Sequence, residues 1–82
     1  MGVHVMTIDD FRVLLEEVLE KSGLAIVPET TAGDIEGWDS RNHARVLIRI
    51  EQRYGIDLPI GDIEEAKNVG ELLAIVNRTL HE

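Results

Sequence analysis

Cysteine is absent from the 82-residue sequence, which excludes disulfides, thiolate metal sites and a cysteine nucleophile. Histidine is scarce, and His4, His43 and His81 form no pair at the spacing that metal ligands take on a helix, so no metal site is expected. Alternating strand patterns, internal repeats and low-complexity segments are also missing. These absences leave one small helical domain spanning residues 1–82, in which helix packing must supply most of the stability.

Basic residues are few, and long apolar runs are lacking. Eight Lys and Arg stand against 16 Asp and Glu, and the net charge of −8 disfavours binding to nucleic acid and to anionic membranes. No stretch approaches the roughly 20 apolar residues of a membrane span, and residues 1–6 lack the basic start and apolar core of a signal peptide. The sequence therefore predicts a cytoplasmic protein that is not inserted in a membrane, and a monomer is expected.

Capping residues and apolar periodicity predict four helices, near residues 8–22, 40–54, 61–66 and 69–80. Thr7 and Asp10 form a variant of the capping box at the start of the first helix, and Gly23 is expected to end it. The apolar residues that share one face of this helix are Ile8, Phe11, Leu14, Leu15, Val18 and Leu19.

The rest of the chain contains a long connection and two further helices. Residues 24–37 have no sustained period, and their apolar side chains are expected to tuck the connection against the helices: Leu24, Ile26, Val27 and Ile35. Asn68 is expected to cap the last helix in a capping box with Glu71. The buried face of that helix is predicted to be Val69, Leu72, Leu73, Ile75, Val76 and Leu80. The fold class is all-α, a small antiparallel four-helix bundle with a short third helix and a long first loop.

The second helix has the clearest start signal in the chain. Asp39 is a strong N-cap, the helix is expected to begin at Ser40, and Gly55 follows it where a left-handed residue is favoured. Its predicted apolar face is Ala44, Leu47, Ile50 and Tyr54. A serine at this position lies where free N–H groups and the helix dipole both stabilise an anion, so a phosphate on Ser40 would be favourable.

Three motifs together resemble the acyl carrier protein family over essentially the whole chain. They are Gly37-Trp38-Asp39-Ser40, the helix exit Tyr54-Gly55-Ile56-Asp57-Leu58-Pro59, and Asn68-Val69-Gly70-Glu71 downstream. The resemblance implies that Ser40 carries a 4′-phosphopantetheine arm, transferred from coenzyme A by a phosphopantetheinyl transferase. The thiol of the arm would hold acyl or aminoacyl groups as thioesters, and it would supply the sulfur that the chain lacks.

The same resemblance implies a carrier with no catalytic residues of its own. Its partners would be the transferase and the enzymes that load and transfer acyl groups in fatty acid, lipid or polyketide-type biosynthesis. Asp39 matches the acidic residue that precedes the serine in the family and that is thought to help the transferase and its magnesium engage, although helix capping alone explains an aspartate there. The sequence does not specify the cargo, because the volume between the helices depends on packing.

The second helix departs from the family in its charge. Arg41, Arg45, Arg49 and Arg53 follow one another at four-residue steps, with Ile48 beside them, whereas this helix is acidic in most acyl carrier proteins and the residue after the serine is usually apolar. Like charges at that spacing cost an isolated helix about 0.2–0.5 kcal/mol per pair. These five residues, called the arginine face below, are predicted to bind partner proteins.

Two explanations of the arginine face remain open. The acid-rich rest of the chain can fold close enough to pair with it, and it includes Glu29, Asp34, Glu36 and Glu64. Alternatively, the face docks dedicated enzymes that present acidic patches. A different class of function is an unmodified helical interaction module that uses this face for binding and carries nothing on Ser40.

Two residues near Ser40 are assigned structural roles. Trp38, the only tryptophan, is expected to anchor the loop against the core, although its place beside Ser40 would let it touch the pantetheine arm. His43 is expected to be a partly exposed helix residue with no catalytic or metal role.

Overall fold

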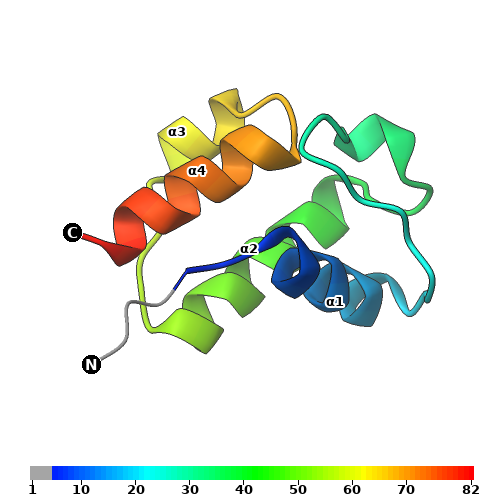
Figure 1. Ribbon diagram of the computed structural model, residues 1–82, viewed down its shortest axis with the longest axis horizontal. Helices are drawn as coiled ribbons and strands as arrows, with labels where there is room; N and C mark the ends of the chain where they lie inside the picture. The colour runs from blue at the N-terminus through cyan, green and yellow to red at the C-terminus, as the bar shows by residue number, and fades with distance from the viewer. Residues whose placement is uncertain (1–4) are drawn as a thin grey trace.

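The computed structural model describes residues 5–82, so His4 lies outside the described residues. Within them the elements are α1 (Ile8–Leu19), the short 3₁₀ turn η1 (Ala32–Asp34), α2 (Ser40–Tyr54), α3 (Ile60–Glu65) and α4 (Val69–Leu80), and none is a strand. In Figure 1, α1 runs in one direction while α2 and α4 run back in the other. The predicted all-α fold with four helices is confirmed.

The core is formed by one cluster of buried apolar side chains between the helices. α1 packs mainly on α2, and α3 packs on α4. The cluster consists of Met6, Phe11, Leu14, Leu15, Ile26, Trp38, Val46, Ile50, Leu58, Ile63, Val69, Leu72, Leu73 and Val76. The face predicted for α2 was partly wrong, because Val46 is fully buried while Ala44 is exposed. Val46 lies one turn before Ile50 and therefore shares its inward face, whereas Ala44 lies about a third of a turn away from it.

The predicted bounds of α2 and α4 and the start of α1 are confirmed, Gly55 takes the expected left-handed conformation, and α3 lies one residue earlier than predicted. Thr7 and Asp10 form the full capping box of α1. This helix stops at Leu19, three residues before the predicted end, because Glu20 takes the left-handed conformation with a φ of 57°. The Glu16 carboxylate then accepts a hydrogen bond from the backbone N–H of Leu24 at 2.9 Å, which turns the chain away from the helix axis.

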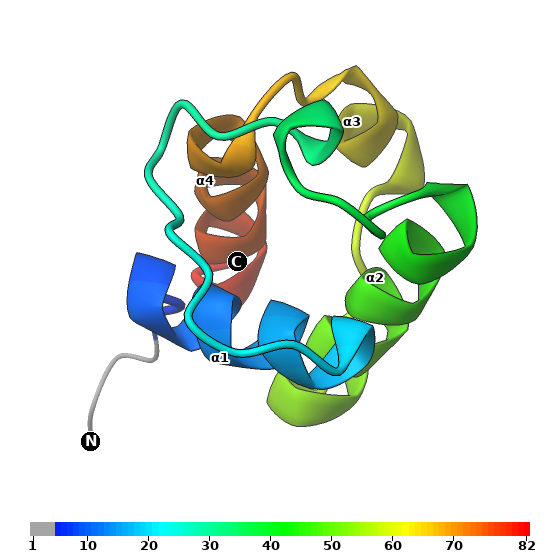
Figure 2. The same cartoon turned by 90° about the vertical axis from the view of Figure 1, so that its right-hand side faces the viewer.

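The long connection runs along the outside of α1 to the start of α4 (Figure 2). Pro28 and Thr30 accept hydrogen bonds through their carbonyls from the N–H groups of Gly70 and Val69, both at 2.8 Å. Two N–H groups in the first turn of α4, which have no acceptor within the helix, therefore bond to carbonyls of the connection. Ile26 is buried as predicted, whereas Val27 is 53 % exposed and does not help to anchor the connection.

The first turn of α4 differs from the predicted capping box. Asn68 does cap the helix, accepting a hydrogen bond from the N–H of Glu71 at 2.9 Å. The Glu71 carboxylate, however, bonds to the N–H of Lys67 at 2.8 Å rather than to that of Asn68.

The start of the described chain lies against α4. The side chain of Asn77 forms two hydrogen bonds with the backbone of Met6, of 2.7 and 3.1 Å.

Candidate functional site

Ser40 is the first residue of α2, and its side chain is exposed. The loop before it is held by local hydrogen bonds. Asp39 accepts a hydrogen bond from the N–H of Asn42 at 2.9 Å, and the Asn42 amide donates to the Gly37 carbonyl at 2.7 Å. Lys21 donates to the carbonyl of Glu36 at 2.6 Å. Ser40 is therefore presented to solvent from a fixed turn, and Asp39 is confirmed as the N-cap.

The start of α2 offers hydrogen-bond donors to an anion. Among residues 5–82, the backbone N–H groups of Ser40 and Arg41 have no acceptor, as expected for the first turn of a helix. The positive end of the helix dipole lies at the same place. A phosphate bonded to the Ser40 oxygen would lie next to both features, so the backbone here suits a phosphodiester.

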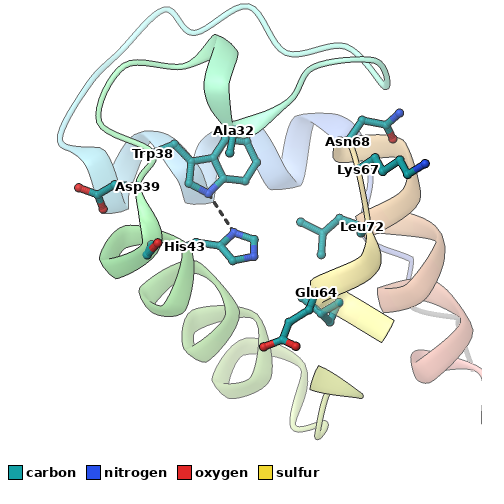
Figure 3. A pocket seen from close by; sticks show the side chains of 11 residues that line it. Ala32, Trp38, Asp39, His43, Glu64, Lys67, Asn68 and Leu72 are labelled. Carbon is teal, nitrogen blue, oxygen red and sulfur yellow. Dashed lines mark hydrogen bonds between the residues drawn. The ribbon is translucent and has the colours of Figure 1, made fainter. Parts of the chain in front are cut away.

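A cavity of about 440 Å³ opens beside Ser40. Its wall comes from the start of α2, the loop before it, α3 and α4, as Figure 3 shows. Trp38 and His43 contribute from the Ser40 side, and Ile63, Ala66 and Leu72 contribute from the opposite side. Asp39, Glu64, Lys67 and Asn68 also line it, so the wall combines apolar and charged side chains and has a serine at its rim. The cavity is large enough to hold part of a chain-like ligand that is attached at Ser40.

Trp38 and His43 form a hydrogen-bonded pair in this wall. The indole Nε1–H of Trp38 donates to Nδ1 of His43 at 3.1 Å. Trp38 is 7 % exposed, and its ring packs on Phe11 with a centroid distance of 5.6 Å, which confirms its predicted role as a loop anchor. Burial lowers the pKa of His43, because desolvation disfavours the charged imidazole.

His43 lies on a partly exposed helix face, as predicted, whereas its hydrogen bond with Trp38 and its place in the cavity wall were not predicted. The available signal was its spacing of three residues from Ser40, which puts both residues on one side of a helix. His81, the other described histidine, is exposed at the end of α4. In residues 5–82 no cluster of side chains that could hold a metal ion is present.

The arginine face is exposed along α2. Arg41, Arg45, Ile48, Arg49 and Arg53 all lie on the surface, and Ile48 is 51 % exposed. Only one of the arginines forms an ion pair within residues 5–82, namely Arg49 with Glu17 of α1 at 3.4 Å.

Internal pairing with the four predicted acidic residues is not found. None of Glu29, Asp34, Glu36 and Glu64 lies within ion-pair distance of an arginine of this face in the described chain. Glu36 instead lies 4.0 Å from Lys21, which holds the loop before Ser40. The four acidic residues named above were therefore wrong as partners. Pairing within the described chain is found for one of the four charges, that of Arg49 with Glu17.

No helix in the part of the chain that the structure describes has both the length and the apolar character needed to cross a membrane.

Comparison with known proteins agrees with this geometry. The family model for the phosphopantetheine attachment site matches residues 9–76. Among solved structures, the chain is similar to the solution structure of the holo acyl carrier protein from Geobacter metallireducens, with a TM-score of 0.83 and 31 % sequence identity. That match covers 92 % of this chain and 86 % of the other. Comparison with the sequences of curated proteins gives no match.

Residues 5–82 form four helices with an exposed serine at the start of the second, which is the arrangement of a carrier domain. The chain belongs to the phosphopantetheine attachment family, as an acyl carrier protein that is not itself a catalyst. The prosthetic group of this family is covalently attached 4′-phosphopantetheine. The residues present fit that group, because Ser40 is exposed, free N–H groups lie beside it and a cavity opens next to it.

Proposed function

We propose that Ser40 is the residue that carries the 4′-phosphopantetheine arm, and that the protein delivers acyl or aminoacyl groups to partner enzymes. The observation that carries this proposal is the exposed Ser40 side chain at the first residue of α2, on the rim of the cavity. When bound, the group supplies a thiol that holds the cargo as a thioester, which a chain without cysteine cannot do alone. The carrier domain is proposed to span residues 1–82, with the family match over 9–76 at its centre.

Attachment requires a separate transferase. In this reaction the Ser40 oxygen bonds to the phosphorus next to the pantetheine of coenzyme A, adenosine bisphosphate leaves, and the serine proton passes to a base. Within residues 5–82 no neighbouring side chain bonds to the Ser40 hydroxyl. Asp39 caps α2 through Oδ1, which accepts from the Asn42 N–H, and the Nδ1 lone pair of His43 accepts a hydrogen bond from Trp38. We therefore expect the transferase to supply the base, while Asp39 helps it and its magnesium to engage.

Intact-mass measurement tests the attachment site. After incubation with coenzyme A and a broad-specificity phosphopantetheinyl transferase, the protein should gain one phosphopantetheine, and Ser40→Ala should gain none. The chain offers a matched control, because its one other serine, Ser22, is also exposed. Ser22→Ala should load as the wild type does. A wild-type protein that stays unmodified would favour the alternative, an unmodified helical interaction module.

The arginine face supports a proposal about partners. We propose that Arg41, Arg45, Ile48, Arg49 and Arg53 dock enzymes through acidic patches on the enzymes. Three of the four arginines form no ion pair within residues 5–82. The backbone N–H of Thr7 and, to a smaller extent, the charge of Arg53 lower the pKa of Asp10, while the charges of Arg41 and Arg45 are available to a partner. Ile48 adds exposed apolar surface among them, which suits an interface with a small apolar centre and a charged rim. Complementary charge speeds encounter and discourages the wrong partners.

A charge-reversal experiment tests the docking face. Arg45→Glu with Arg49→Glu should slow acyl transfer with the cognate enzymes, and raising the salt concentration should reduce the difference from the wild type. Arg78→Glu is the control, because Arg78 lies on α4 and pairs with Asp62 at 2.8 Å, away from this face. Unchanged rates for the double variant with every cognate enzyme would refute the docking role.

The pathway, the location and the assembly state belong to the same proposal. The carrier is proposed to serve fatty acid, lipid or polyketide-type biosynthesis in the cytoplasm, as a monomer. Purification from the native host with the cargo intact, followed by weighing the attached group, distinguishes these pathways.

A further inference from the structure

The hydrogen bond between Trp38 and His43 determines where the imidazole carries its proton. The indole Nε1–H is a donor only, so His43 must accept at Nδ1, 3.1 Å away. A neutral imidazole has one N–H group and one lone pair. The proton of neutral His43 is therefore on Nε2. The lowered pKa of His43, caused by its burial, agrees with a neutral ring at physiological pH.

The Nε2–H group of His43 faces the cavity beside Ser40. His43 lines this cavity, and Figure 3 shows its second ring nitrogen on the side turned away from Trp38, toward the open space. Within residues 5–82 the His43 imidazole forms one hydrogen bond, which it accepts from Trp38 at Nδ1, and Nε2 forms none. In the described chain, every fully buried side-chain nitrogen and oxygen has a hydrogen-bond partner. Nε2 of His43 has none, so it is not fully buried and is accessible in the cavity that His43 lines. It is a directed donor in a wall that combines apolar and polar side chains.

The position of His43 relative to Ser40 determines which part of an attached group lies within reach of the Nε2–H. The two residues are three apart on α2, and such pairs have Cβ atoms about 5–6 Å apart on one helix face. A group attached to the Ser40 oxygen and entering the cavity therefore passes His43 within its first few bonds. That part of a phosphopantetheine arm contains phosphodiester oxygens, followed by the hydroxyl and carbonyl of its first amide unit, all of which can accept a hydrogen bond.

We propose that His43 donates its Nε2–H to an oxygen of the phosphopantetheine arm close to Ser40, and that Trp38 is a positioning residue that holds the imidazole in the required tautomer. This inference rests on the proposed attachment at Ser40. Its consequence is that the first part of the arm is held against the cavity between α2 and α3, rather than moving freely in solvent. Trp38 then acts through its hydrogen bond to His43 and through the packing of its ring on Phe11.

The first test compares the apo and holo forms of the wild-type protein by NMR, so it needs no variant to fold. The ¹⁵N shifts of His43 should report the Nε2–H tautomer in both forms. On loading, the Nε2–H resonance should shift, and its exchange with water should slow about 2- to 10-fold, the factor expected for one hydrogen bond of ordinary net strength. An Nε2–H resonance with the same shift and exchange rate in both forms would overturn the inference.

Variants separate a contact with the arm from a purely structural role. His43→Phe removes the donor and should increase the mobility of the arm, seen in relaxation of the isotope-labelled arm amides. His43→Gln keeps an acceptor for Trp38 and a donor for the arm, so it should restore part of the restraint. Trp38→Phe leaves the donor but removes the tautomer lock, and both imidazole tautomers should appear. Arm relaxation identical in His43→Phe and wild type would contradict the proposal.

Phosphorus NMR and mass measurement complete the experiment. A ³¹P shift that changes in His43→Phe assigns the acceptor to the phosphodiester, and a change confined to the first carbonyl of the arm assigns it there. Intact mass on the same samples shows whether Ser40 is loaded. Loading with an unchanged His43 signal overturns only this inference, whereas failure to load overturns the proposed attachment and this inference with it.

Discussion

Replacing Asp39 separates its two assigned roles, helix cap and transferase recognition. The Asp39 carboxylate accepts a hydrogen bond from the N–H of Asn42 at 2.9 Å, and the side chain is exposed, so Asp39→Ala removes a cap without leaving a hole in the core. Loss of such a cap costs about 1 kcal/mol. A domain of 82 residues has a total stability on the order of 4–12 kcal/mol. The melting temperature should therefore fall by about 4–8 °C.

Asp39→Asn is the matched variant. Asparagine caps helices about as well as aspartate, so its melting temperature should stay close to that of the wild type. It lacks the charge that the transferase and its magnesium are expected to engage. We therefore expect both variants to load phosphopantetheine more slowly than the wild type, although only Asp39→Ala is clearly destabilised.

The assay combines thermal unfolding with initial rates of loading from saturating coenzyme A, measured well below both melting temperatures. An unchanged melting temperature in Asp39→Ala would refute the capping argument. Wild-type loading of Asp39→Asn would show that the transferase does not use the charge, and Asp39 would then be a cap only.

Two further predictions concern stability. Gly61→Ala should stabilise the protein by up to about 1 kcal/mol in thermal unfolding, because nothing lies within 4 Å of the added Cβ and alanine favours a helix. Gly70→Ala should lack this gain, since its Cβ would lie 3.2 Å from the Cβ and the carbonyl oxygen of Pro28, and an equal gain would contradict the close approach of loop and helix. The backbone N–H of Thr7 lowers the pKa of Asp10 by hydrogen bonding to its carboxylate, so this contribution to stability is present above the unfolded pKa and is lost as the pH falls through the lower folded value. Melts between pH 6 and 2 should show the loss below about pH 4, and Asp10→Asn should reduce it; equal pH profiles would refute the assignment.

The helix starts could be predicted because capping is local. Thr7, Asp39 and Asn68 each bond to the N–H three residues further on, and each was identified from a stretch of four residues. The end of α1 could not be predicted in the same way. Gly23 was the expected stop, but Glu20 takes the left-handed conformation, which a non-glycine residue adopts only where its surroundings stabilise it.

The site shows the same division between local and distant contacts. The place of Ser40 at a helix start follows from its immediate neighbours, and it was predicted correctly. The cavity was not predictable, because its wall combines residues from α2, α3 and α4 that meet only after packing. The ion pair between Glu17 and Arg49 joins residues 32 positions apart, so no pattern within α2 reveals it.

The most direct test of the account is to isolate the protein from its native cells without breaking thioesters, weigh it intact and fragment it to locate any added mass. We expect phosphopantetheine, free or carrying an acyl group, on Ser40. A protein that is unmodified in cells that also contain an active phosphopantetheinyl transferase, or one that carries the added mass on another residue, would contradict this expectation.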